Sequence, residues 1–165
     1  MASKKVKELE KALKDHLESN KELRRNNYRE KAREGLNIKD ANIEAEVLKQ
    51  KFQNAKIKEI RDFIKNNQPL KIEVGKQGKH ILGHNNYIEG RSYLTISLEE
   101  AQELINKYAG TGDLDMDSKG NWRKKEIIKT DKEIGVNVSM LDGSETKTNN
   151  FKIHYSKKGT HIVPN

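Results

Sequence analysis

Cysteine, long apolar runs and aromatic residues are scarce or absent in this 165-residue sequence. Without cysteine it can form no disulfide framework, use no thiol nucleophile and hold no cysteine-based zinc or iron–sulfur site. A membrane-spanning helix needs about 18 or more consecutive apolar residues, whereas pairs such as Ile81-Leu82 are typical of the apolar runs here. The basic N-terminus, Met1 to Lys5, is followed by no apolar core. We therefore expect neither a cleavable signal peptide nor a membrane segment.

The composition is strongly polar, with 33% hydrophobic and 35% charged residues and a mean hydropathy of −1.00. It predicts one domain of about 100 residues plus an exposed segment. The net charge of +8 favours an anionic partner such as nucleic acid. Residues 1–70 carry +6 of this charge and residues 71–165 only +2, so the charge itself says little about what the second part does.

Residues 1–69 have the composition of a helical segment. Between Ser3 and Gln68 there is no proline and only one glycine, Gly35, and apolar residues recur at three- and four-residue steps. We expect Gly35 to end a first helix, Asp40 to cap a second, and Pro69 to close it. The segment is then a linker, scaffold or oligomerisation piece of two long amphipathic helices, folded as a hairpin or paired with another chain.

Residues 70–165 show short apolar runs punctuated by glycine, which is typical of strands. The expected strands are 71–74, 80–83, 93–96, 125–130, 135–140 and 151–156. Ser97 and Glu100 form a capping box for a helix that Gly110 ends. Asp142-Gly143 and Lys157-Lys158-Gly159 are turn signals. The fold class predicted is α+β: two long N-terminal helices, then a small domain with one main helix and an antiparallel sheet that ends in a meander.

Four of the five histidines lie in this second part. Two imidazoles can act as base and acid on one substrate, which is what metal-independent RNA cleavage requires. In the alternating segment 151–156, His154 shares the outward face with Lys152 and Ser156. Beyond the turn at Gly159 the chain could run back, which would place His161 near His154. An exposed histidine without a function is the plainer interpretation of each position taken alone.

Three other motifs fail on inspection. Asp113 to Asp117 starts like a calcium loop, but Ser118 stands where glycine is needed and Lys124 where glutamate is needed, so we interpret it as an acidic loop. His80 and His84 have helical zinc spacing but lie in a glycine-flanked segment without the other ligands. The glycines at 75, 78 and 83 do not form a phosphate-binding Walker loop. No metal or other cofactor is expected.

Several blocks resemble the bacterial toxin 50 domain, also called polymorphic toxin type 50. They are Lys76-Gln77-Gly78-Lys79-His80-Ile81, Arg91-Ser92-Tyr93-Leu94-Thr95, Tyr108-Ala109-Gly110-Thr111-Gly112 and the long segment from Ile153 to Pro164. The resemblance covers about residues 70–165 and leaves out the helical part. It implies a ribonuclease toxin of the barnase/EndoU/colicin/RelE-like fold, as found at the C-termini of secreted bacterial toxins and phage minor head proteins.

The resemblance also points to a set of polar positions. They are Lys79, His80, Arg91, Ser92, Thr148, His154, Ser156, Lys157 and His161. On chemical grounds we expect His154 and His80 to be the acid and base, with His161 able to replace either. Lys157 and Lys79 would stabilise the phosphorane, and Ser156 and Thr148 would bind phosphate oxygens.

These features favour an endoribonuclease toxin whose partners are RNA and an acidic immunity protein. The helices would bind a second copy, or a phage or carrier protein, and the toxin would act in the cytoplasm of a target or host cell after secretion or phage delivery. Two alternatives stay open. The chain could be a structural fragment of a phage minor head protein, or a nucleic-acid-binding module without catalysis, although the scarce aromatics make a poor stacking surface.

Overall fold

The computed structural model describes the backbone of residues 3–26 and 35–165, with side chains for residues 3–21 and 41–165. The chain divides into two compact units, Met1–Glu59 and Ile60–Asn165. Helix α1 (Lys4–Asn26) and helix α2 (Gly35–Asn66) confirm the two long helices. Within the first unit, the Nε2 atom of His16 in α1 lies 2.8 Å from the Ala41 carbonyl oxygen of α2.

The expected helix boundaries near residue 35 were wrong. Helix α2 begins at Gly35, so Gly35 does not end the first helix and Asp40 lies inside the second. Asparagine and aspartate cost a helix interior no more than about 0.7 kcal/mol each relative to alanine. A cap signal of this kind is therefore easily overridden. Residues 27–34, between the two helices, lie outside the described part of the chain.

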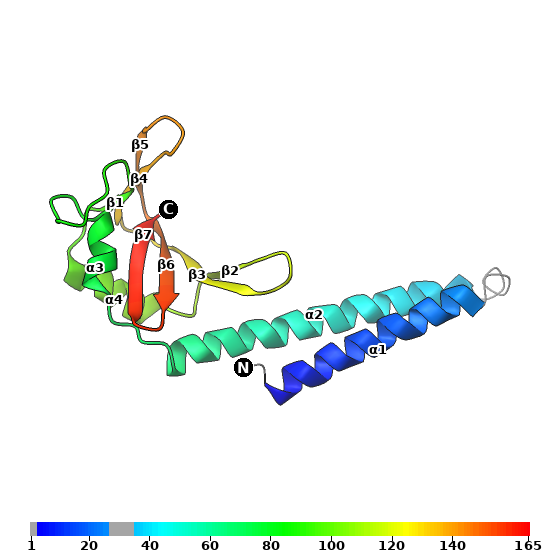
Figure 1. Ribbon diagram of the computed structural model, residues 1–165. Helices are drawn as coiled ribbons and strands as arrows, with labels where there is room; N and C mark the ends of the chain where they lie inside the picture. Colours follow the sequence, from blue (N-terminus) through cyan, green and yellow to red (C-terminus); the bar gives the residue numbers. More distant parts are fainter. Residues whose placement is uncertain (1–2, 27–34) are drawn as a thin grey trace. The chain divides into compact units, whose positions relative to one another are not determined.

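The second unit is a mixed helix and sheet domain, which confirms the α+β class (Figure 1). A four-stranded antiparallel sheet has the order β2-β3-β6-β7, and a three-stranded antiparallel sheet has the order β1-β4-β5. The strands are β1 (Tyr93–Leu94), β2 (Asp113–Met116), β3 (Trp122–Lys129), β4 (Gly135–Val138), β5 (Glu145–Thr148), β6 (Asn150–Ser156) and β7 (Gly159–Pro164). The remaining elements are helix α3 (Val74–Gln77), the 3-10 turn η1 (Gly78–His80) and helix α4 (Leu98–Tyr108).

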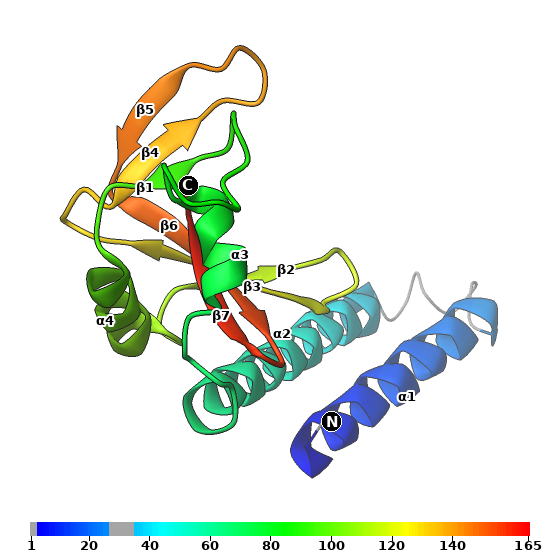
Figure 2. The same cartoon turned by 60° about the vertical axis from the view of Figure 1, so that its left-hand side comes forward.

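The strand order departs from the predicted meander. After β3 the chain leaves for the β4–β5 hairpin, which extends away from the four-stranded sheet, and returns as β6 beside β3 (Figure 2). Segments 71–74 and 80–83 are not strands: Ile72 makes one isolated bridge to Thr160, and α3 and η1 occupy residues 74–80. The acidic segment taken for a loop forms β2 at the edge of the sheet, where Asp113 is exposed and the other three residues are half-buried.

One face of the four-stranded sheet is covered by apolar residues of α4 and the end of α2. Helix α4 has the expected bounds, and Ser97 Oγ accepts the Glu100 N–H at 3.1 Å as a capping box requires. Its Ile105 packs with Ile64 of α2 and with Phe151 and Ile153 of β6 in one core cluster. The last turns of α2 thus belong to the second unit, and the compact division falls before the boundary at residue 69 that the composition suggested.

Candidate active site

Three histidines from three segments of the domain gather at the face of the sheet that α4 leaves open. His154 on β6 and His161 on β7 are direct cross-strand partners, and their ring centroids lie 4.6 Å apart. The His80 ring of η1 stacks beside the His161 ring, with centroids 6.0 Å apart and 11° between the ring planes. The register of β6 and β7 therefore places His161 beside His154 as predicted, and His80 lies beside His161.

Alternation along the two strands explains why these side chains face outward. Residues 151, 153 and 155 of β6 are buried, whereas 152, 154 and 156 are half-buried. Strand β7 repeats the pattern, with residues 160, 162 and 164 buried and His161 half-buried. Directly opposed residues of an antiparallel pair point to the same side. The same alternation that fills the core therefore places His154 and His161 together on the outer face.

Gln77 brings His80 to the open edge of β7. Its amide Oε1 accepts the Ile162 N–H at 2.7 Å, and its Nε2 donates to the Ile162 carbonyl at 2.8 Å. One side chain thus replaces the hydrogen bonds of a neighbouring strand and protects the sheet edge. Because Gln77 ends α3 three residues before His80, this anchor holds η1 against β7 and beside His161.

A backbone carbonyl fixes the His80 ring. Its Nδ1 lies 2.8 Å from the Ser92 carbonyl oxygen, and since a carbonyl only accepts, Nδ1 carries the proton in the neutral ring. Gly78 is required at this turn because a Cβ there would clash with the His84 ring. His84 in turn accepts the Asn86 N–H through Nδ1 at 3.0 Å, so His84 supports the loop.

Burial lowers the pKa of all three imidazoles below the usual value of 6.5. The pKa of His154 falls to about 3 and that of His161 to about 4. For His80 the lowering by burial is partly offset by the hydrogen bond to the Ser92 carbonyl, which favours the protonated ring. In the protein without substrate, His154 and His161 are neutral at pH 7 and able to accept a proton.

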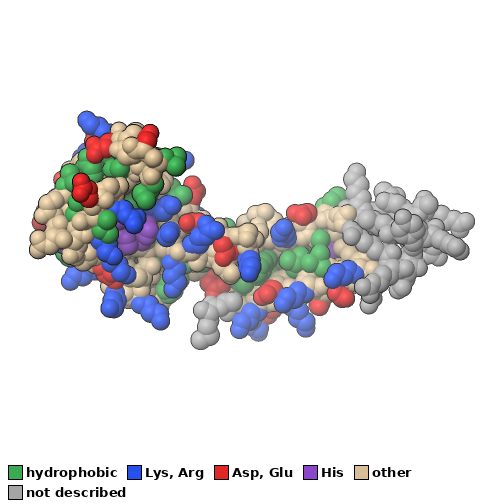
Figure 3. Space-filling view, turned by 45° about the horizontal axis from the view of Figure 1, so that its top comes forward, with side chains coloured by type: hydrophobic (Ala, Val, Ile, Leu, Met, Phe, Trp, Pro, Cys, Tyr) green, Lys and Arg blue, Asp and Glu red, His purple; other side chains and the backbone are tan. Residues whose placement is uncertain are grey.

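Four lysines surround the histidines, and their positive charges add to the effect of burial. Lys125 and Lys152 lower the pKa of His154, while Lys76 and Lys79 lower that of His161. Lys125 is the cross-strand partner of His154 on β3, and it is half-buried like Lys152. Figure 3 shows the histidine patch with lysine and arginine side chains close by. The face therefore combines proton acceptors with a concentration of positive charge.

The negative charge of Glu73 opposes this effect at His161. Ser156 Oγ donates to Glu73 Oε1 at 2.9 Å, and Lys76 Nζ lies 3.3 Å from Glu73 Oε2. The hydrogen bond from Ser156 is the main reason that the pKa of Glu73 lies below its usual value. Glu73 is therefore ionised beside the histidines. Ser156 and Glu73 hold the β6–β7 hairpin against the start of α3.

The other predicted hydroxyls are occupied by structural bonds. Ser92 Oγ donates to Asn137 Oδ1 at 3.1 Å and accepts the Val138 N–H at 2.9 Å. Thr148 Oγ1 donates to the carbonyl oxygen of Asn165 at 2.8 Å. Asn165 lies four residues beyond His161, which is about 13 Å along a strand. Thr148 is therefore not brought to the histidines.

The predicted cations occupy the periphery of the site. Lys79 and Arg91 are exposed, and the charges of both lower the pKa of His80. Lys157 is exposed in the two-residue turn between β6 and β7, three residues beyond His154. Sequence reasoning gave no role to Lys125 or Glu73. The β3–β6 register would have revealed Lys125, but no local motif marks either residue.

In the described part of the chain, no third metal-ligating side chain accompanies His80 and His84. Within residues whose side chains are described, no group of three or more histidine, aspartate or glutamate side chains is arranged to hold a metal ion.

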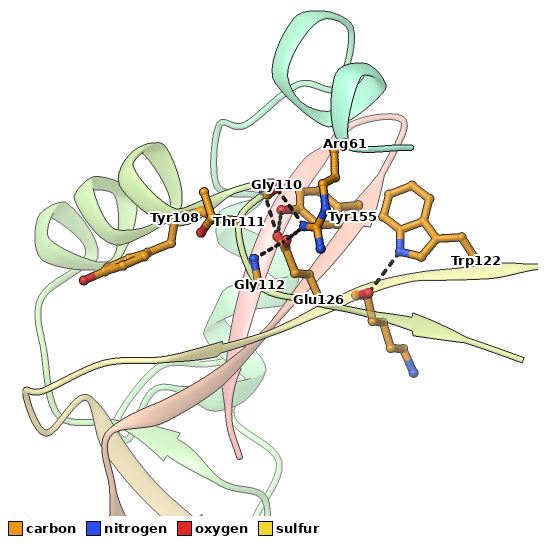
Figure 4. Close-up of polar contacts among 9 residues, drawn as sticks. Arg61, Tyr108, Gly110, Thr111, Gly112, Trp122, Glu126 and Tyr155 are labelled. Atoms are coloured by element: carbon orange, nitrogen blue, oxygen red, sulfur yellow. Dashed lines mark hydrogen bonds and ion pairs between the residues drawn. The ribbon is translucent and has the colours of Figure 1, made fainter. Parts of the chain in front are cut away.

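The opposite face of the same strands carries a buried carboxylate, Glu126 of β3, which is fully inaccessible to solvent. Its oxygens accept the N–H groups of Gly110 and Gly112 at 2.9 Å each and the Tyr155 hydroxyl at 2.8 Å (Figure 4). Arg61 Nη1 lies 3.6 Å from Glu126 Oε2 and donates to the Gly110 carbonyl at 2.8 Å. This network ties the end of α2 and the α4–β2 loop to the sheet beneath the histidines.

Comparison with known families covers the domain that contains both faces. Residues 72–164 match the family model for Bacterial toxin 50. The chain belongs to the bacterial toxin 50 family. The match confirms the resemblance inferred from the sequence blocks and supports a toxin function. No curated protein matches the chain.

All three histidines and the four surrounding lysines lie within the residues matched to the bacterial toxin 50 family. The match begins at Ile72, the residue that bridges to Thr160 at the edge of β7. Helix α1 and helix α2 precede it. No helix in the described residues is long and apolar enough to cross a membrane.

Proposed function

We propose that this domain is an endoribonuclease toxin that cleaves RNA through attack of a ribose 2′-hydroxyl on the adjacent phosphate. The observation that carries the proposal is the group of three contacting imidazoles, ringed by Lys76, Lys79, Lys125 and Lys152, on one face of a bacterial toxin domain. RNA supplies both an anion for the lysines and a proton for an imidazole to remove.

His154 is the general base in this proposal. Burial, helped by the charges of His161, Lys125 and Lys152, keeps the ring neutral at pH 7, which is the form that accepts a proton. As the 2′-oxygen attacks phosphorus, its proton passes to His154. The half-buried lysines then lie beside a site where negative charge on the phosphoryl oxygens increases, which is where fixed cations stabilise a transition state.

His80 is the general acid. The Ser92 carbonyl offsets part of the lowering of the His80 pKa by burial, and the negative charge of a bound phosphodiester raises an imidazole pKa. His80 gives its proton to the 5′-oxygen as the bond from phosphorus to that oxygen breaks. The products are a 2′,3′-cyclic phosphate and a 5′-hydroxyl. His161, whose ring lies beside both, passes the proton from His154 back to His80 after the cleavage step. Lys79, Arg91 and Lys157 bind flanking phosphates.

The first test is cleavage of total RNA and tRNA by the full chain in the presence of EDTA, with mapping of the cut sites and their end groups. We expect cyclic phosphate ends, and a loss of about 10²–10⁴-fold in rate for His154→Asn. His16→Asn is the matched control, because His16 lies in the helical unit outside the family match. Full activity of His154→Asn, or complete inhibition by EDTA, would overturn the mechanism.

A second test separates the two proton-transfer roles. An RNA analogue with sulfur in place of the scissile 5′-oxygen has a leaving group that needs no acid. His80→Asn should therefore be slow on normal RNA but close to wild type on the analogue, whereas His154→Asn should be slow on both. The opposite pattern would exchange the two roles.

We also propose that an acidic immunity protein covers the histidine face. The four lysines there offer the charge that such a partner would recognise. Binding should weaken as salt increases, and Lys125→Gln with Lys152→Gln should weaken it further. A partner whose footprint is confined to α1 and α2 would contradict this.

A further inference from the structure

The domain also contains a cleft whose chemistry differs from that of the histidine face. It is a cleft of about 630 Å³ between the loop of residues 81–92 and the β4–β5 hairpin. Leu82, Tyr87, Tyr93 and Val138 supply apolar and aromatic wall, and Glu89 and Glu145 supply carboxylates. The volume is within the range of small-molecule sites, which are about 300–1,000 Å³. The described residues that line it include no lysine or arginine.

The cleft and the catalytic histidines share one backbone segment. The Ser92 carbonyl holds His80, and the next residue, Tyr93, lines the cleft. The Ser92 hydroxyl also accepts the Val138 N–H, and Val138 lines the cleft from β4. The segment that fixes the His80 ring therefore also forms part of the cleft wall.

Both tyrosine rings are held in place before any ligand binds. Tyr87 donates its hydroxyl to the Arg91 carbonyl at 3.0 Å, and Tyr93 donates to Glu145 Oε2 at 3.3 Å. Burial and the Glu145 charge raise the pKa of Tyr93, so its hydroxyl stays a donor. Fixed aromatic faces suit base stacking, which is how proteins bind unpaired RNA bases.

The histidine face and the cleft suit different parts of a nucleotide. The histidine face is cationic and suits the phosphate, whereas Glu89 and Glu145 would repel phosphate and accept N–H groups. The Tyr93 hydroxyl occupies one acceptor site on Glu145 Oε2, and an ionised carboxylate offers about four such sites, so both Glu145 oxygens can still accept N–H groups of a ligand. Among the four RNA bases, guanine offers two adjacent N–H donors on its Watson–Crick edge, which match the two oxygens of one carboxylate.

We propose that this cleft binds the base next to the scissile phosphate and selects guanine, through stacking on Tyr87 and Tyr93 and hydrogen bonds to Glu145. The inference rests on the proposed ribonuclease function for its biological meaning, but base binding is measurable without cleavage. With this site, the proposed nuclease would cut RNA preferentially beside guanine.

The test is titration of the full chain with the 3′-monophosphates of guanosine, adenosine, cytidine and uridine, followed by calorimetry and by NMR shifts. We expect guanosine 3′-monophosphate to bind at least about tenfold tighter than the others, since a bidentate base contact typically discriminates by about 10- to 100-fold. Glu145→Gln should remove most of that preference. Glu103→Gln, an exposed carboxylate on α4, is the matched control. Tyr93→Phe keeps the ring and loses only the hydroxyl bond, so it should retain the preference.

Equal affinity for the four nucleotides, or a preference that Glu145→Gln leaves unchanged, would overturn the inference. Melting temperatures of the variants check that each one folds. The two proposals fail separately: guanine preference without RNA cleavage would remove the ribonuclease function and keep the base site, while cleavage without base preference would do the reverse.

Discussion

The two faces of the β3–β6 strand pair carry polar groups of opposite kinds. On the inner face Glu126 is inaccessible to solvent, and its oxygens bind two backbone N–H groups and the Tyr155 hydroxyl. On the outer face Lys125 and His154, each next to one of these residues in the chain, are half-buried and oppose one another across the strands. On these two strands, the polar groups of Glu126 and Tyr155 are therefore hydrogen-bonded inside the fold, whereas those of their neighbours Lys125 and His154 face outward.

Under the proposed function, that difference assigns stability to the inner face and reactivity to the outer face. A buried carboxylate is tolerated only with full hydrogen bonding, and the Glu126 network provides it. On the outer face, by contrast, burial and neighbouring cations hold the imidazoles in their neutral form. Such destabilised protonation states are common at functional sites. Loss of an inner group should thus cost stability, and loss of an outer group should cost activity.

The largest effect should follow from Glu126→Ala. The variant leaves the Gly110 and Gly112 N–H groups, the Tyr155 hydroxyl and the Arg61 charge without their acceptor, so we expect a loss of about 3–5 kcal/mol in the free energy of unfolding. Urea unfolding monitored by fluorescence measures it, because Trp122 is the only tryptophan and its ring centroid lies 5.5 Å from that of Tyr155. Exposed Glu133→Ala should change stability by less than about 0.5 kcal/mol. Equal losses in the two variants would abolish the contrast between the faces.

The next effect is acid sensitivity from the outer face. In the unfolded chain a histidine binds a proton near pH 6.5, whereas folded His154 and His161 do so only near 3 and 4. The unfolded state therefore holds more protons between these values, and stability falls as pH falls from about 6.5 towards 4. Between pH 7 and pH 5 the loss is at most about 2 kcal/mol for each histidine. His154→Asn should reduce the slope of stability against pH, and an unchanged slope would show that this ring is not kept neutral by the fold.

Local patterns in the sequence predicted the elements whose determinants are near in the chain. Helix α4 follows from the Ser97 capping box and the apolar spacing, and its predicted start is the observed one. The outward position of His154 follows from alternation in β6, which requires no knowledge of the partner strands. In both cases a single segment contains the physical cause.

Features that depend on distant partners were missed. Segments 71–74 and 80–83 looked like strands, but Gln77 bonds Ile162, 85 residues away, and residues 74–80 form α3 and η1 instead. Lys125 reaches His154 only because the β4–β5 hairpin leaves the sheet between β3 and β6. Glu73 meets Ser156 across 83 residues. Short apolar runs do not distinguish strand from turn in such cases, since tertiary hydrogen bonds decide.

The smallest effect should come from single lysines of the outer face. Lys152→Gln removes one cation near His154, so it should move the NMR titration of that ring upward, towards its ordinary pKa. If Lys152 also contacts RNA phosphate, the slope of log affinity against log salt should become shallower by about 0.7, the value for one contact to a single strand. Lys119→Gln, an exposed lysine in the turn between β2 and β3, should alter neither quantity. An upward titration with an unchanged salt slope would assign Lys152 to tuning His154 alone, whereas two unchanged readouts would remove Lys152 from the site and leave Lys125 as the lysine beside the base.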